Sequence, residues 1–175
     1  NTDHLHPEPQ FLLVQERVTP AATADFMRYE PEKLPANTRA LAAELLAKRK
    51  ASYVHYLEQP DDRTNRHLDF FGKSNLMVTD TGELKFVDTS SKYADYSKVA
   101  YPVPFVLGTT ALFESILGTD PHTLLQDPFY SALVAEPKFA PLKQLVTNPK
   151  KFRQKLRQLI ISGALVVSEA KINKT

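Results

Sequence analysis

The distribution of proline decides which regular elements this 175-residue sequence can form, because it contains thirteen prolines and only five glycines. Proline fixes φ and lacks a backbone donor, so it tends to end a helix or to mark a turn. The prolines therefore divide the chain into separate segments. No internal repeat or low-complexity tract is present, and the length fits one domain with one core.

A long helix is predicted between two of these breaks. Asn37 suits the N-cap, and apolar residues then recur at helical spacing until Gln59 and Pro60 end the pattern. The expected buried positions are Leu41, Leu45, Leu46, Tyr53, Val54 and Leu57.

Two short apolar runs, 76–78 and 84–87, flank the turn-forming residues Asp80, Thr81 and Gly82. This arrangement predicts an antiparallel hairpin. Further upstream, residues 11–14 suit a buried strand, and residues 19–35 suit a loop with one helical turn.

The second half of the chain is predicted to be a cluster of helices. One helix is expected from Phe105 to Leu117, ending at Gly118. Three further helix starts combine a capping residue with a following proline, at Asp120, Asp127 and Asn148. The predicted class is α+β, mainly helical with a small hairpin, because a doubly wound fold needs more sheet.

Charge and composition exclude several kinds of site and partner. The formal net charge is only +2, so neither a nucleic-acid partner nor a membrane partner is expected. The chain has no cysteine, which excludes disulfides and thiolate metal sites. No apolar run is long enough to span a bilayer, and the N-terminus is unlike a signal peptide. We therefore expect a soluble and cytoplasmic protein.

Polar residues suited to phosphoryl transfer surround the predicted hairpin. His67 and Asp69 precede it, Asn75 borders its first strand and Asp88 follows its second strand. Phosphoryl transfer uses a carboxylate to accept the proton of an attacking hydroxyl, and oxygen ligands to hold Mg²⁺ against nucleotide phosphates.

This segment of about 22 residues resembles the catalytic loop and metal-binding hairpin of the protein-kinase superfamily, which includes small-molecule phosphotransferases. The resemblance implies a protein-kinase-like C-terminal lobe using ATP and Mg²⁺. It implies that Asp69 is the catalytic base and that Asn75 and Asp88 are metal ligands. It also implies that Lys73 neutralises the transferred phosphate.

Two features depart from the family pattern. Five residues separate Asp69 from Asn75 here, whereas the family loop has four. Counting back from Asn75 without an insertion would place Phe70 at the base position. Asp88 is followed by Thr89 and Ser90 in place of Phe-Gly, which keeps the metal ligand.

A second resemblance lies at the N-terminus, where residues 11–18 are similar to the last small-lobe strand and the adenine-binding hinge. It implies that the backbone carbonyl of Glu16 and the backbone N–H of Val18 contact adenine. Residues 1–18 would then end the small lobe, and residues 19–175 would form the C-terminal lobe. No glycine occurs before Gly72, so we expect a fragment whose Gly-rich loop and strand lysine come from missing upstream residues.

The leading hypothesis is a phosphotransferase that transfers the ATP γ-phosphate to a hydroxyl of a protein or a small molecule. One alternative is a pseudokinase or kinase-like interaction scaffold without catalysis. A more remote alternative is a helical protein that binds a partner through a cationic helix. The same cations also fit a solvated face; they are Lys150, Lys151, Arg153, Lys155 and Arg157.

Overall fold

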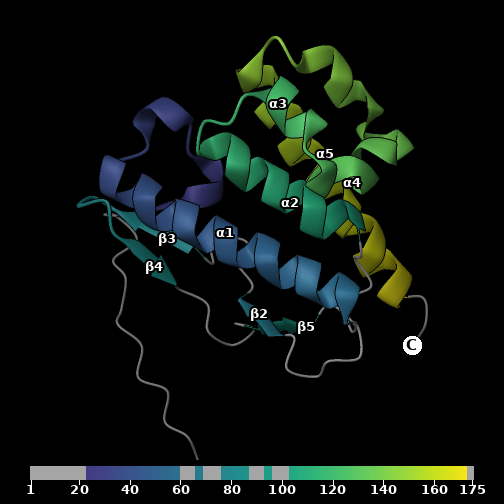
Figure 1. Cartoon of the computed structure of the whole chain (residues 1–175), viewed down its shortest axis with the longest axis horizontal. Coiled ribbons are helices and arrows are strands. Elements are labelled where there is room, and N and C mark those ends of the chain that lie inside the picture. Colours follow the sequence, from purple (N-terminus) through teal and green to yellow (C-terminus); the bar gives the residue numbers. More distant parts are fainter. Residues whose placement is uncertain (1–22, 60–65, 69–75, 87–92, 96–102, 173–175) are drawn as a thin grey trace, which may run out of the picture.

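The computed structural model describes residues 23–59, 66–68, 76–86, 93–95 and 103–172, and within these ranges it leaves the side chains of 23–24, 66–68, 86, 93–95, 103–105 and 161–172 undescribed. These parts form a mainly helical fold with two small antiparallel sheets, which confirms the predicted α+β class (Figure 1). In chain order the elements are β1 (Thr23–Asp25), η2 (Phe26–Arg28), η3 (Pro31–Lys33), α1 (Ala36–Glu58), β2 (Arg66–Leu68), β3 (Leu76–Thr79), β4 (Leu84–Phe86), β5 (Tyr93–Asp95), α2 (Val103–Ile116), α3 (Pro121–Gln126), η4 (Pro128–Tyr130), α4 (Ser131–Ala135), η5 (Pro137–Leu145) and α5 (Pro149–Ile172).

The predicted hairpin is confirmed as β3 and β4, with Val78 opposite Leu84. Its turn closes through hydrogen bonds between Thr79 and residues 82 and 83, and Gly82 takes the positive φ of 81° that this turn requires. Strand β1 lies on the other side of β3, giving the order β1-β3-β4. The sequence predicts a loop over residues 19–35, so β1 is a correction to that prediction.

A second sheet pairs β2 with β5, and His67 lies opposite Ala94 in this ladder. Each of these strands has three residues. Neither was predicted, because three residues are too few to show an alternating pattern.

Helix α1 is confirmed, but two details of its prediction are wrong. The N-cap position is Pro35, and Asn37 lies inside the helix, where its side chain donates to the carbonyl of Thr81. The buried face is confirmed only in part: Tyr53 is buried and Leu45 and Leu46 pack against the core, but polar residues occupy two of the buried positions. The buried side chains are Thr38, Ala42, Arg49 and Tyr53, whereas Leu41, Val54 and Leu57 are exposed.

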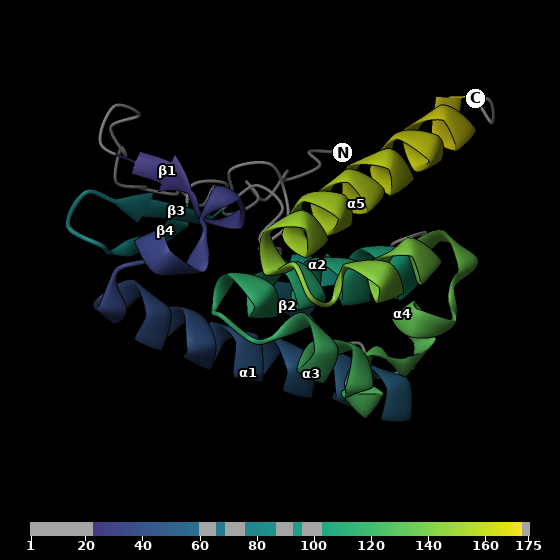
Figure 2. The same ribbon diagram turned by 90° about the horizontal axis from the view of Figure 1, so that it is seen from above.

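The helical second half is confirmed, and α2 lies between α1 and α5 (Figures 1 and 2). The three capping predictions are also confirmed. The carboxylate of Asp120 accepts from two backbone N–H groups of α3, Asp127 caps η4, and Asn148 accepts from the N–H of Lys151 in α5. Gly118 ends the α2 region with φ of 100°.

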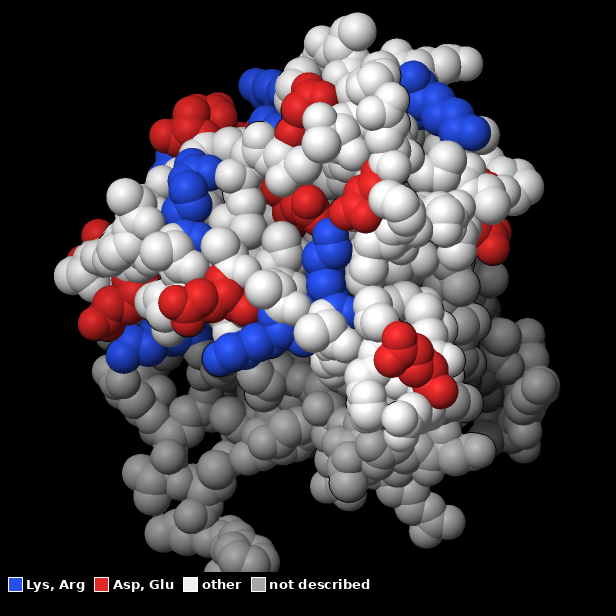
Figure 3. Space-filling view, viewed as in Figure 1, with Lys and Arg blue, Asp and Glu red and all other residues white. Residues whose placement is uncertain are grey.

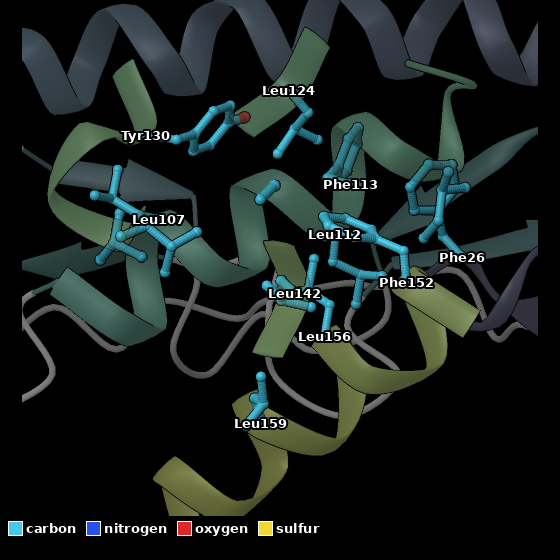
Figure 4. Close-up of a cluster of buried hydrophobic side chains, with 14 of the residues drawn as sticks. Phe26, Leu107, Leu112, Phe113, Leu124, Tyr130, Leu142, Phe152, Leu156 and Leu159 are labelled. Atoms are coloured by element: carbon cyan, nitrogen blue, oxygen red, sulfur yellow. The ribbon is translucent and has the colours of Figure 1, made fainter. Parts of the chain in front are cut away.

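One core joins the sheet end of the fold to the helices (Figure 4). Phe26 of η2 packs against Phe113 of α2 with the rings tilted, and 4.5 Å separates the ring centroids. Phe152 and Leu156 bring α5 into the same cluster and are fully buried. Aromatic pairs of this kind contribute about 0.5–1.5 kcal/mol beyond the apolar area that they bury.

Acidic and basic side chains are interspersed over the face of the molecule shown in Figure 3. Within the described part of the chain, no helix combines the length and the apolar character needed to cross a bilayer.

Candidate functional site

All six residues assigned a role from the sequence fall outside the described residues. They are Glu16, Val18, Asp69, Lys73, Asn75 and Asp88. Phe70, the alternative base, and the predicted strand at residues 11–14 fall there too. The structure does describe the strands that border these segments, so it defines the framework from which the candidate residues extend.

The strands that border the two candidate loops end side by side. Leu68, the last residue of β2, is paired with Tyr93, the first residue of β5. Leu76, the first residue of β3, is paired with Phe86, the last residue of β4. Antiparallel partners have α-carbons about 4.5–5.5 Å apart. Each described end of segment 69–75 therefore lies next to one described end of segment 87–92, although the two segments are separated in sequence.

The hairpin is held to the N-terminal end of α1 at its turn. The hydroxyl of Thr38, which is fully buried, donates to the carbonyl of Gly82. The amide of Asn37 donates to the carbonyl of Thr81 at 3.3 Å. A Cβ at position 82 would lie 2.6 Å from Asn37 Oδ1, so the Asn37 side chain would have to shift, and the positive φ of 81° separately favours glycine here. On the inner side, Leu76 and Val78 are buried, which fixes the hairpin on the core.

Strand β1 links the hairpin to the segment that carries Glu16 and Val18 in the sequence. Asp25 of β1 lies opposite Met77 of β3. The Asp25 carboxylate accepts from the N–H of Met27 at 2.9 Å and so caps η2 directly after the strand.

A polar cluster between α1, α2 and η4 was missed in the sequence. Lys50 Nζ lies 2.8 Å from an Asp127 carboxylate oxygen and 3.3 Å from Glu114 Oε2. The hydroxyl of Tyr130 donates to the same Glu114 oxygen, and Lys50 also lies over the rings of Phe129 and Tyr130. The four polar members lie up to 80 residues apart in sequence, so no local pattern marks them.

The charged groups of this cluster form ion pairs with one another, Lys50 with Glu114 and with Asp127. Burial raises the pKa of Asp127, but the Lys50 ammonium and the N–H of Phe129 outweigh burial and hold that pKa below its ordinary value. Burial, reinforced by the Glu114 carboxylate, raises the pKa of Tyr130 far above its ordinary value. Each charged group has an opposite partner, which favours a role in joining the helices.

A second cluster corrects the prediction that the cations of α5 form one solvated face. Arg153 is buried and donates through Nε to Glu30 Oε2 at 3.0 Å. Arg157 donates to Glu30 Oε1 at 3.2 Å, and to the backbone carbonyls of Met27 and Tyr29. We call Glu30, Arg153 and Arg157 the Glu30 clamp. Only the lysines of the predicted face are left for solvent.

Charge in the Glu30 clamp is also balanced by hydrogen bonding. Burial raises the pKa of Glu30, but the bonds from Arg153 and Arg157 outweigh it and hold that pKa below its ordinary value. The clamp ties the first turns of α5 to the segment between β1 and α1.

In the described part of the chain, no group of three or more histidine, aspartate or glutamate residues is placed to hold a metal ion. The predicted metal ligands Asn75 and Asp88 lie outside this part.

Comparison of this chain with models of known protein families, with curated proteins and with solved structures found no match.

Proposed function

We propose that this chain is the C-terminal lobe of a protein-kinase-like phosphotransferase, which transfers the γ-phosphate of ATP to a hydroxyl group. The observation that carries the proposal is the pairing of the strands that border the two candidate loops, β2 with β5 and β3 with β4.

The order of elements supports the proposal. A long helix leads to a strand ending one residue before Asp69, then to a hairpin that starts one residue after Asn75 and ends two residues before Asp88. Catalytic loops and metal-binding loops of this superfamily border such a hairpin. The pairs Leu68–Tyr93 and Leu76–Phe86 give both loops neighbouring starting points.

In this proposal each candidate residue has a separate task. Asp69 accepts the proton of the attacking hydroxyl, and Lys73 offsets charge on the transferred phosphate. The oxygen ligands of Asn75 and Asp88 fit Mg²⁺, which prefers carboxylate and carbonyl oxygen. Mg²⁺, when bound, neutralises negative charge on the nucleotide phosphates.

Adenine would be held by the backbone of Glu16 and Val18, in the segment that leads into β1. The Gly-rich loop and strand lysine of the small lobe would come from outside these 175 residues, because no glycine precedes Gly72. The hydroxyl substrate would be a protein or a small molecule.

A pseudokinase is the second candidate, and the length of the loop favours it. Five residues lie between Asp69 and Asn75, where active members have four. If the inserted residue displaces Asp69 from the base position, the lobe would serve as an interaction scaffold.

Metal-dependent nucleotide binding tests the site in this chain. Calorimetry with Mg²⁺ and ATP should show weak binding that Asp88→Asn lowers about tenfold or more, since a charged ligand is removed. Asp80→Asn is the matched control, because Asp80 is exposed on the hairpin turn. Equal losses in both variants, or no metal dependence, would overturn the proposed site.

Turnover separates the enzyme from the pseudokinase in a protein that includes its small lobe. Asp69→Asn should lower phosphoryl transfer by about 10²–10⁴-fold and leave nucleotide affinity nearly unchanged, because it removes proton acceptance without changing shape. An inert Asp69→Asn together with activity gained in Phe70→Asp would identify the natural protein as a pseudokinase.

A further inference from the structure

Positive charge is concentrated in the C-terminal quarter of the chain, although the whole chain is nearly neutral. Between Glu136 and Glu169 the sequence has no acidic residue. The same interval contains five lysines and two arginines; they are Lys138, Lys143, Lys150, Lys151, Arg153, Lys155 and Arg157.

The structure separates these cations into two groups. Arg153 and Arg157 turn toward Glu30 in the clamp. Lys150 and Lys151 are exposed and Lys155 is half-exposed, and none of the three is ion-paired to any residue that the structure describes.

On α5 the lysines share one side of the helix. At 100° per residue, Lys150, Lys151 and Lys155 span an arc of about 140°, and Phe152 and Leu156 fall outside it. Those two side chains are fully buried, so the arc faces away from the core. Lys143 is exposed in the last turn of η5, which packs against α5 and precedes it by a short turn. We call Lys150, Lys151 and Lys155 the lysine face.

The chemistry of the lysine face fits a partner with diffuse negative charge. Lysine is a strongly hydrated point charge, whereas planar recognition of single carboxylates or phosphates uses arginine. Phe139 and Phe152, the two aromatic residues of the interval, are buried, so neither can stack on a nucleic-acid base.

The sequence that follows the lysines favours a lipid surface among such partners. Leu159 and Ile160 pack in or against the core, and residues 161–167, with five apolar residues, one serine and one glycine, continue the same helix beyond them. Figure 2 shows the C-terminal end of α5 running out beyond the helices on which it packs. Basic residues followed by an apolar helical stretch are typical of helices that bind anionic bilayers at their surface.

We propose that the lysine face docks this protein on an anionic lipid bilayer, with α5 as the contacting helix. The stretch of seven residues, 161–167, is about 10 Å long, too short to cross a hydrocarbon core of about 30 Å. The contact is therefore peripheral. This inference is independent of the proposed phosphotransferase function. It departs from the expectation of no membrane partner. That expectation used the net charge of the whole chain, which hides the concentration of positive charge between Glu136 and Glu169.

Vesicle co-sedimentation of the full chain tests the proposal. Vesicles of phosphatidylcholine with about 30% phosphatidylserine should bind the protein at about 0.1 M salt and release it at about 0.5 M, where the Debye length is about 4 Å. The variant Lys150→Gln/Lys151→Gln should lower the partition coefficient about 30-fold, since each surface lysine contributes about fivefold.

The matched control is Lys33→Gln/Lys48→Gln, which removes the same charge from exposed positions on η3 and α1. Its partition coefficient should stay within about twofold of the parent protein when the lysine face makes the contact. Circular dichroism of each variant shows that the helices are retained.

Four results would overturn the proposal. The first is equal binding to vesicles of pure phosphatidylcholine, and the second is an equal loss of binding in both double variants. The third is tighter binding to duplex DNA or to polyglutamate than to the anionic vesicles, which would assign the lysine face to a nucleic-acid or protein partner. Absence of binding to any vesicle is equally decisive against it.

Discussion

Replacing Glu30 by glutamine should lower the free energy of unfolding more than a typical substitution near the surface does. The Glu30 side chain is 21% exposed. Glu30 accepts two bonds from Arg153 and one from Arg157. In the variant Arg157 keeps the carbonyls of Met27 and Tyr29 as acceptors. The Arg153 side chain, only 7% exposed, keeps no acidic partner among the described residues.

The expected loss of stability follows from the Arg153 charge, which is buried and loses its acidic partner. Removing one partner of a buried ion pair costs about 3–5 kcal/mol. The glutamine oxygen still accepts a bond from a guanidinium and recovers part of this, so we expect a loss of about 2 kcal/mol. With an m-value of about 2 kcal/mol/M, the urea midpoint should fall by about 1 M.

Urea unfolding followed by circular dichroism measures the change, and Glu83→Gln is the control. The Glu83 side chain is 60% exposed and pairs with Lys85 at 3.4 Å, so its loss should cost less than about 0.5 kcal/mol. Acid provides a second check. The native pKa of Glu30 lies below its ordinary value of about 4.3, so its contribution is complete above that pH and disappears as pH falls through the native pKa. A midpoint shift equal to that of the control, or a difference from the parent that persists unchanged at about pH 2, would refute the reasoning.

Two further substitutions test the hairpin turn and the polar cluster. Gly82→Ala should lower the free energy of unfolding by about 2 kcal/mol, because φ of 81° is unfavourable for a residue with a Cβ and that Cβ also meets Asn37. In a double-mutant cycle with Asn37→Ala, the part of the loss that comes from this contact should be recovered. Simple additivity of the two substitutions would contradict the contact. Tyr130→Phe should lower the free energy of unfolding by about 1 kcal/mol through the lost bond to Glu114. Because the native pKa of Tyr130 is raised, the parent should also lose stability as pH rises above about 10, and thermal unfolding should show a smaller alkaline loss in the variant.

Local chemistry in the sequence was sufficient for the elements that depend on it. Asp120, Asp127 and Asn148 each precede a proline and each caps a helix, because capping needs only residues within one turn. The β3–β4 hairpin was predictable for the same reason, since Gly82 and its neighbours set the turn.

Features that depend on distant partners were not predictable. The buried face of α1 contains Thr38 and Arg49, whose burial is permitted by Gly82 and Thr110 of other elements. The inward turn of Arg153 requires Glu30, 123 residues away. Of the candidate site, the bordering strands could be foreseen only at the hairpin, and β2 and β5 form through pairing across the fold.

The Glu30 clamp also constrains when the protein can fold during synthesis. Glu30 is translated 123 residues before Arg153, an interval of about 6–25 s at about 5–20 residues per second. Phe26, next to the clamp, likewise lacks its aromatic partner until Phe113 has been made. Until α5 leaves the ribosome, the Glu30 carboxylate has no arginine partner and the core lacks Phe152 and Leu156, so the nascent chain depends on α5 to complete its fold.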